Sequence, residues 1–294
     1  IFSVGSSLTK WWMFAPLPGD RAIIQSTIDE LDLNRDYPIE HAVLGDAKLV
    51  LAAMTAEAEA QIASGNRPVS DDPTAEIKAV KDAWIADFMP NFTSNEAPMD
   101  PYRVYWDLMH TVDLDNTIIT HDSGNTRDAI SPFWQTTVPG SYQGWGHSTQ
   151  LGFSQAFSIG LKMANPNKTV INVLGDAGFG MNAMDLETAC RNNIATLTVL
   201  INNSALGNYE GHMPLATEIY KLKYLTGDYT KVAEGLAAGV VQPIPNPAYR
   251  KSAVWLSDIA KLHPKEVEKT VTVYGEGVPS IRINRDQNKA TAAA

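Results

Sequence analysis

The pattern of apolar and polar positions predicts helices and strands that alternate along most of the chain. Short runs rich in β-branched residues predict buried strands, and apolar residues at helical spacing predict helices between them. Buried strands separated by helices are typical of a parallel sheet that is covered on both faces, so the predicted fold class is α/β. The predicted strands cover residues 1–5, 22–29, 117–120, 169–174 and 196–201; one predicted helix begins near residue 46, and the others cover 75–88, 101–112, 150–164 and 184–192.

Two polar stretches interrupt this pattern and indicate the domain organisation. Residues 64–74 contain one glycine, two prolines and two aspartates, and this composition is typical of a linker. Residues 91–101 form a second predicted loop. We therefore expect four segments, which cover residues 1–63, 64–95, 96–235 and 236–294. The last of them lacks the apolar pattern of a closing helix and strand.

Composition narrows the class of protein. The 294 residues are 44% hydrophobic and 19% charged, which is ordinary for a globular protein. No stretch approaches the roughly 18 consecutive apolar residues of a membrane-spanning helix, so we expect no membrane partner. The 33 acidic residues exceed the 23 basic residues and give a net charge of −10. Because a surface of this sign repels a polyanion, we expect no nucleic-acid partner either.

The cysteine count and the first residues add two expectations. Cys190 is the single cysteine, which argues against a disulfide framework, a thiolate zinc site and a cysteine-held iron–sulfur cluster and fits a reduced, cytoplasmic setting. Residues 1–5 predict a buried strand that runs into a glycine turn, and they lack the basic residues with which signal peptides begin. We therefore expect the chain to be one piece of a larger enzyme.

Two short motifs follow neighbouring predicted strands. The sequence Gly-Asp-Ala-Gly-Phe-Gly (175–180) follows one strand, and Asn202 and Asn203 follow the next. One predicted helix separates the strands, so they form a βαβ unit whose carboxyl ends lie side by side at the ligand-binding edge of the sheet. The Asp176 carboxylate and the Asn203 amide are hard oxygen donors, which suit Mg²⁺ or Ca²⁺ together with phosphate oxygens. The glycines let backbone N–H groups approach those phosphates.

Each motif alone is most simply explained as a turn or a loop. A dinucleotide fingerprint is another alternative, but the glycines follow the pattern G-x-x-G-x-G rather than the Rossmann spacing. The joint occurrence favours a ligand site, because a strand, Gly-Asp, a helix, a second strand and Asn-Asn follow in order, with 24 residues between Ala177 and Asn202.

This combination resembles the thiamine diphosphate-binding motif, in which Gly-Asp-Gly or Gly-Asp-Ala is followed at this distance by Asn-Asn. It is most similar to the motif of the acetolactate synthase-like branch, which includes the 2-hydroxyacyl-CoA and oxalyl-CoA lyases. The resemblance implies thiamine diphosphate and Mg²⁺ as cofactors, with the metal held by the side chains of Asp176 and Asn203 and by the main-chain carbonyl of Ala205. It also implies cofactor contacts for Asp176 and Asn203 and for the rest of the first motif, Gly175, Ala177, Gly178 and Phe179.

The resemblance extends to two flanking loops. Residues 144–153 resemble the family segment in which a bulky apolar residue, here Leu151, bends the bound cofactor into a V. The main-chain carbonyl of Thr149 would then accept a hydrogen bond from the aminopyrimidine ring of the cofactor. Residues 121–126 match a family loop that touches the diphosphate, and the resemblance assigns this contact to Asn125. Without the resemblance, Leu151 is most simply a core residue and the polar loop is a turn.

The resemblance covers about residues 1–235 and implies an enzyme that decarboxylates or joins a 2-oxo acid, or cleaves a 2-hydroxyacyl-CoA. Residues 1–63 resemble the end of the family's central domain, and residues 236–294 fall where family members often place an active-site lid. The family's pyrimidine-binding domain, with its catalytic glutamate, has no counterpart here, so no residue of this chain is assigned to catalysis. We therefore expect a partner chain or segment that carries that domain, in a homodimer or tetramer of the full enzyme.

Two alternatives remain open. The β subunit of a 2-oxoacid:ferredoxin oxidoreductase has a similar length and the same cofactor motif, but it should carry several cluster cysteines, and this chain has only Cys190. A non-catalytic remnant that binds a nucleotide within residues 1–60 would bind no thiamine diphosphate.

Overall fold

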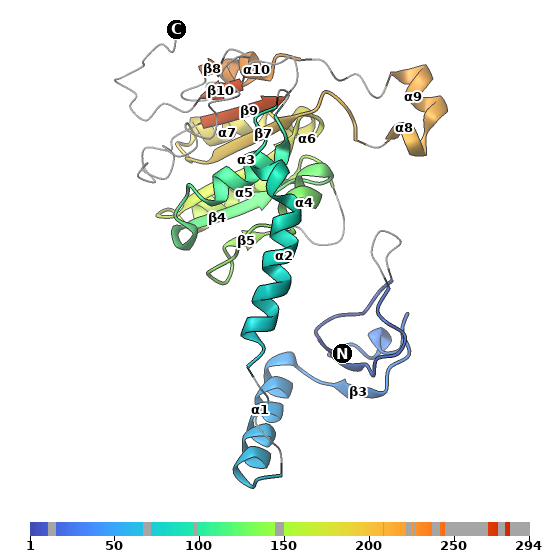
Figure 1. Ribbon diagram of the computed structural model, residues 1–294. Helices are drawn as coiled ribbons and strands as arrows, with labels where there is room; N and C mark the ends of the chain where they lie inside the picture. The colour runs from blue at the N-terminus through green and yellow to red at the C-terminus, as the bar shows by residue number, and fades with distance from the viewer. Residues whose placement is uncertain are drawn as a thin grey trace. The chain divides into compact units, whose positions relative to one another are not determined.

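Figure 1 shows the computed structural model of the chain, which divides into two compact units. The units are Ile1–Lys78 and Ala79–Ala294, and the division falls within helix α2 (Thr74–Phe92), inside the segment 64–95. The structure describes residues 1–10, 16–66, 72–96, 99–144, 150–207, 209–221, 225, 227–236, 242–244, 270–275 and 280–282. Thr149 and most of the segment 236–294, which the resemblance interprets as a lid, lie outside the described residues.

The first unit is a small parallel sheet followed by a helix. Its elements are β1 (Phe2–Val4), β2 (Ile24–Thr27), the 3-10 turn η1 (Glu30–Asp32), β3 (His41–Leu44) and α1 (Ala47–Ala63). The strands are hydrogen-bonded in the order β1-β2-β3. Helix α1 begins after Asp46, whose carboxylate accepts a hydrogen bond from the backbone N–H of Leu49 at 3.1 Å. The first strand is present as predicted, but Ile1 and Phe2 are exposed rather than buried.

The second unit is built on a five-stranded parallel sheet with the order β5-β4-β6-β7-β9. The strands of this sheet are β4 (Thr117–His121), β5 (Tyr142–Gln143), β6 (Thr169–Gly175), β7 (Leu197–Asn202) and β9 (Thr270–Gly275). A separate antiparallel pair consists of β8 (Gln242–Ile244) and β10 (Ser280–Arg282). The parallel sheet confirms the predicted fold class.

Strand β9 corrects the sequence analysis, which found no closing strand beyond residue 235. Residues 270–275 pair with β7 in parallel, with Thr270 opposite Leu197 and Gly275 opposite Asn202. The run Thr-Val-Thr-Val-Tyr is rich in β-branched and aromatic residues, which favour a strand. The strand was not predicted from the sequence because the residues on both sides of this run are mostly polar.

The described part of the second unit also contains helices and a 3-10 turn that follow α2. They are α3 (Pro101–Met109), the 3-10 turn η2 (Leu114–Asn116), α4 (Asn125–Ile130), α5 (Phe153–Ala164), α6 (Asp176–Asn182), α7 (Asp185–Arg191), α8 (Tyr209–His212), α9 (Pro214–Tyr220) and α10 (Tyr229–Gly235). The sequence predicts a glycine-rich loop and one helix between β6 and β7, whereas the structure has two short helices, α6 and α7. Burial of Phe179 against the sheet overrides the low helix propensity of the glycines in α6. Within the described residues, no helix has both the length and the apolar character needed to cross a membrane.

Helices cover both faces of this sheet. On one face, side chains of α3 and α4 form a core cluster with β4, β6 and β7. On the other face, side chains of α6, α7 and α10 form a second cluster with β6 and β7. Strand β6 serves both clusters, because Ile171 and Val173 belong to the first and Leu174 belongs to the second.

Helix α5 directs polar side chains toward the sheet. Gln155 Oε1 accepts hydrogen bonds from Asn172 Nδ2 at 3.2 Å and from Thr198 Oγ1 at 3.5 Å, and all three residues are fully buried. On the outer side of the same helix, Gly160 and Met163 are exposed. The helix is therefore polar toward the core and apolar toward its outer surface, which reverses the usual arrangement of a surface helix.

We predict that Ile171→Ala lowers the free energy of unfolding by about 2–5 kcal/mol, because it leaves a cavity in the first core cluster. Urea denaturation measures this change. As a matched control, Ile219→Ala on α9, where the side chain is 58% exposed, should change the free energy by less than about 0.5 kcal/mol. Equal stability of Ile171→Ala and the wild-type chain would contradict the core assignment.

Candidate functional site

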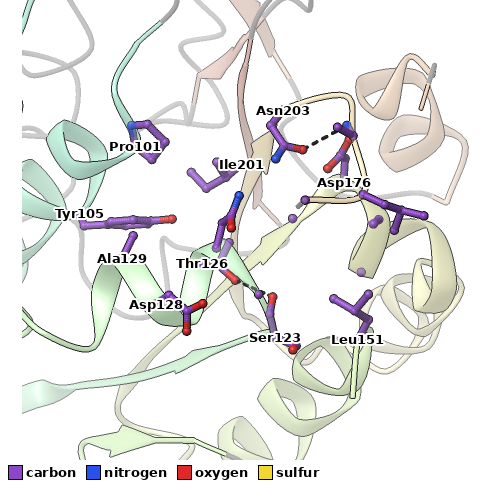
Figure 2. A pocket seen from close by; sticks show the side chains of 18 of the residues that line it. Pro101, Tyr105, Ser123, Thr126, Asp128, Ala129, Leu151, Asp176, Ile201 and Asn203 are labelled. Atoms are coloured by element: carbon purple, nitrogen blue, oxygen red, sulfur yellow. Dashed lines mark hydrogen bonds between the residues drawn. The ribbon is translucent and has the colours of Figure 1, made fainter. Parts of the chain in front are cut away.

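The polar motifs predicted from the sequence meet at one edge of the five-stranded sheet. Strands β4, β6 and β7 are parallel neighbours, so their carboxyl ends lie together. Asp122 follows β4, Asp176 follows β6 and Asn203 follows β7. A cavity of about 500 Å³ opens there, and Figure 2 shows the side chains that line it. The lining includes the predicted residues Asn125, Leu151, Gly175, Asp176, Ala177, Gly178, Asn203 and Ala205.

Phe179 differs from its predicted place, because its side chain lies in the core and not in the cavity. It packs with Leu174 and Leu186, and its ring centroid lies 5.9 Å from that of Tyr229. Helical spacing explains the difference, since neighbouring residues of α6 cannot all point to the same side. Phe179 therefore anchors α6, which carries Asp176 at its first position.

Asp176 provides the buried charge of the site. Only 2% of its surface is exposed, and its Oδ2 atom makes no hydrogen bond within the described part of the chain. Burial raises the pKa of Asp176 above the ordinary range of aspartate, and backbone N–H groups, including those of Ala177, Ser204 and Ala205, oppose this shift. A buried carboxylate oxygen without a partner costs free energy that a bound cation would recover.

The two asparagines after β7 have different surroundings. Asn202 is buried, and its Oδ1 accepts hydrogen bonds from Ser204 N at 2.9 Å and from Ser204 Oγ at 3.2 Å. Ser204 has a left-handed backbone with φ of 54°, so Asn202 stabilises the turn. Asn203 lines the cavity, and its Oδ1 accepts a hydrogen bond from Ala205 N at 3.1 Å. Figure 2 shows this oxygen on the side of Asp176, which favours Asn203 over Asn202 as the metal-facing residue.

Asn125 and Leu151 enter the cavity from two further loops. Asn125 begins α4 directly after Gly124, whose φ is 77°. Its amide lies against Gly207, because a Cβ on Gly207 would come within 3.2 Å of Asn125 Nδ2. Leu151 precedes α5 and lines the cavity beside the helix that carries Asp176 (Figure 2). The predicted contacts therefore converge from loops that are far apart in the sequence.

Asp122 is a buried carboxylate that the sequence analysis did not single out. Its Oδ2 accepts a hydrogen bond from the backbone N–H of Gly152 at 2.7 Å, and its Oδ1 accepts one from that of Ser123 at 2.9 Å. A Cβ on Gly178 would overlap Oδ2, so a larger residue at that position of α6 would displace the Asp122 carboxylate. Burial raises the pKa of Asp122, and the two backbone hydrogen bonds oppose this shift. Asp122 therefore joins the end of β4 to the start of α5 and to α6.

The donor set at Asp176 fits a hard cation. Within the described residues, no group of three or more His, Cys, Asp or Glu side chains could hold a metal ion. A cation would instead be held by one carboxylate with neutral oxygens, namely the Asn203 amide and the Ala205 carbonyl. Mg²⁺ accepts such a set when phosphate oxygens and water complete its coordination. The residues present therefore fit a metal–diphosphate group.

The opposite end of the cavity is apolar and aromatic. Figure 2 shows Pro101 and Tyr105 of α3, Ala129 of α4 and Ile201 of β7 at this end. The sequence motifs did not indicate these residues, because apolar spacing in a helix predicts only a core face. The cavity thus combines a polar end at Asp176 and Asn203 with an aromatic end at Tyr105.

Comparisons with known proteins agree with the motif. Residues 122–254 match the family model described as thiamine pyrophosphate enzyme, C-terminal TPP binding domain. The chain is 31% identical over 206 residues to a probable acetolactate synthase large subunit from Methanocaldococcus jannaschii, a match that covers 66% of this chain and 32% of that protein. It is 23% identical over 198 residues to a 2-hydroxyacyl-CoA lyase from Arabidopsis thaliana, covering 63% of this chain and 32% of that protein.

Two solved structures share the fold. A thiamine diphosphate-dependent 4-hydroxybenzoylformate decarboxylase from Rhodococcus jostii RHA1 gives a TM-score of 0.63 at 18% identity, over 97% of this chain and 49% of that one. A benzoylformate decarboxylase from Polynucleobacter necessarius gives 0.62 at 12% identity, over 94% and 48%. The chain spans about a third of the length of the curated relatives described above. Residues 122–254 therefore form a domain similar to the C-terminal TPP-binding domain of thiamine pyrophosphate enzymes, as the Gly-Asp and Asn-Asn motifs predict.

Proposed function

We propose that this chain supplies the diphosphate- and Mg²⁺-binding half of a thiamine diphosphate-dependent enzyme that cleaves or joins C–C bonds. The observation that carries the proposal is the unpartnered, buried oxygen of Asp176, which lies near Asn203 at the ends of adjacent parallel strands. A divalent cation between this carboxylate and a diphosphate would compensate both negative groups. In this proposal, residues 1–63 end a central domain, 64–95 form a linker with a helix, 96–235 bind the diphosphate, and 236–294 contain a lid.

Residues of the cavity bind the cofactor in this proposal. Asp176, Asn203 and the carbonyl of Ala205 hold Mg²⁺. The amide of Asn125 donates a hydrogen bond to the diphosphate from the end of β4. Gly178 and Ala177 line the cavity in the first turn of α6, and in this proposal phosphate oxygens lie against this turn.

Leu151 orients the cofactor rings in this proposal. Its branched side chain lines the cavity near α6 and supports the rings from one side. The carbonyl of Thr149 accepts a hydrogen bond from the aminopyrimidine ring. When bound, thiamine diphosphate supplies carbanion chemistry at its thiazolium ring, and the protein supplies binding, orientation and electrostatics.

The substrate is a 2-oxo acid or a 2-hydroxyacyl-CoA thioester in this proposal. The names of the similar proteins support this class, since they include an acetolactate synthase, a 2-hydroxyacyl-CoA lyase and two decarboxylases of benzoylformate type. The reaction is accordingly a decarboxylation, a carboligation or the cleavage of an acyl-CoA.

A pyrimidine-binding chain or segment completes the site, in a homodimer or tetramer of the full enzyme. An exposed apolar surface next to the cavity supports this part of the proposal. Met181 and Met184 are 59% and 68% exposed, and a Cβ on Gly152 would lie 3.2 Å from Met181 Cβ. Clustered apolar side chains beside a ligand cavity are typical of a surface that another protein covers.

We predict that Asp176→Ala abolishes the Mg²⁺-dependent binding of thiamine diphosphate, because the diphosphate then lies uncompensated in an acidic protein. Isothermal titration with and without Mg²⁺ measures the affinity. Asn203→Ala should weaken binding by a smaller factor, since it removes a neutral ligand. The control Asp87→Ala, at an exposed position of α2, should bind like the wild-type chain. Unchanged affinity of Asp176→Ala would overturn the metal assignment, and a larger loss with Asn202→Ala than with Asn203→Ala would show that Asn202, and not Asn203, is the ligand.

Leu151→Ala should keep the affinity for thiamine diphosphate within about tenfold but lower the turnover, because the metal anchor is intact and only the ring geometry relaxes. Titration and single-turnover kinetics of the complete enzyme separate the two quantities. A collapse of affinity together with normal turnover of the bound fraction would contradict the orienting role.

The 294-residue chain alone should release no CO₂ from a 2-oxo acid in the presence of Mg²⁺ and thiamine diphosphate, because in this proposal the group that protonates the pyrimidine side lies on the pyrimidine-binding segment. Activity should appear when a segment with the pyrimidine-binding domain is added, in proportion to the complex formed. Full activity of the chain alone, in a monodisperse preparation without a second polypeptide, would refute the split site.

A further inference from the structure

The aromatic end of the cavity contains a hydroxyl group that the proposed function does not use. Tyr105 is only 3% exposed, and its ring belongs to the core cluster on the α3 face of the sheet. Within the described residues, its hydroxyl takes part in no hydrogen bond. By contrast, the hydroxyl of Tyr142 is 2.6 Å from Ser131 Oγ. Tyr105 therefore lines the cavity with a hydroxyl that has no partner in the described part of the chain.

The hydroxyl of Tyr105 points into the cavity. Figure 2 shows the ring entering from α3, on the opposite side of the cavity from Leu151 and Asp176. Burial is the main cause that raises the pKa of Tyr105 far above the ordinary range of tyrosine, so the hydroxyl stays protonated and can donate a hydrogen bond at neutral pH.

The position of Tyr105 determines which part of a bound cofactor it would meet. Tyr105 lies on the opposite side of the cavity from Leu151 and Asp176, so with the rings against Leu151 and a metal between Asp176 and Asn203, the far end of a diphosphate would be the part nearest α3. Resting on the proposed function, we propose that Tyr105 Oη donates a hydrogen bond to the terminal phosphate of thiamine diphosphate. Tyr105 is then a further binding residue for this cofactor and distinguishes a diphosphate from a monophosphate.

A purely structural role explains the ring of Tyr105 but not its hydroxyl. Phenylalanine would fill the same space in the cluster, and a hydroxyl that faces the cavity without a protein partner adds little to the stability of the ligand-free chain. A phosphate oxygen restores the missing hydrogen bond, and bonds to a charged acceptor are stronger than those between neutral groups. The hydroxyl therefore stabilises the complex and not the free chain.

The test compares two ligands on the 294-residue chain and on its Tyr105→Phe variant. Isothermal titration with Mg²⁺ measures the affinity for thiamine diphosphate and for thiamine monophosphate. Tyr105→Phe should weaken the binding of the diphosphate by about tenfold and that of the monophosphate by less than about twofold, because only the diphosphate reaches Tyr105. Tyr142→Phe, which removes a hydroxyl outside the cavity, should leave both affinities unchanged.

Thermal unfolding of the ligand-free variants provides a second readout. Tyr105→Phe should unfold at the same temperature as the wild-type chain or at a higher one. If the hydroxyl made a structural hydrogen bond in the free chain, its removal would lower the unfolding temperature of the variant. Equal affinities of the wild-type chain and Tyr105→Phe for thiamine diphosphate, or an equal loss for both ligands, would overturn the role of Tyr105. If Asp176→Ala still abolished binding in that case, the proposed function would stand. Absence of Mg²⁺-dependent binding to the wild-type chain would overturn both.

Discussion

The hydrogen bond from the Gly152 backbone to the Asp122 carboxylate determines how the parts of the site fit together. Gly152 adjoins Leu151 at the start of α5, and the same carboxylate occupies the space above Gly178 on α6. Because Asp122 directly follows β4, one buried side chain relates the ends of β4 and β6 and the loop before α5. A shift of any of these elements would break the hydrogen bond or create a steric overlap. The cavity therefore takes its shape from a contact just outside it.

This arrangement concentrates negative charge in a poorly solvated place. Burial raises the pKa of both Asp122 and Asp176, and in each case the opposing groups that act on the carboxyl are backbone N–H groups. Backbone dipoles offset desolvation only in part, so each ionised carboxylate reduces the stability of the ligand-free chain near neutral pH. The two carboxylates differ in how many of their oxygens accept a hydrogen bond. Both oxygens of Asp122 have backbone donors, whereas Oδ2 of Asp176 has none within the described residues, and a cation can therefore act there.

The parts of the structure that could be predicted from the sequence depend on local patterns. Gly-Asp and Asn-Asn each follow an apolar strand, and the topology of parallel strands brings Asp176 and Asn203 to one edge. Asp122 and Tyr105 could not be found in this way. Asp122 finds its partner 30 residues later in the chain, and Tyr105 follows a helical apolar pattern that predicts burial but not an unpartnered hydroxyl. The helix α6 was missed because glycine content predicts a loop, whereas the burial of Phe179 depends on tertiary packing.

Helix α5 exposes apolar side chains on its outer surface. Its buried side is mainly polar and makes hydrogen bonds through Gln155 to the polar positions of β6 and β7. Its outer side carries exposed apolar residues such as Met163, and exposed Met181 lies near its first residue. Exposed apolar surface gains free energy only when another surface removes it from water. Because the start of this helix adjoins the cavity at Leu151, the second polypeptide of the proposed function would cover this end of the helix and the cavity together, so that association and completion of the site would be one event.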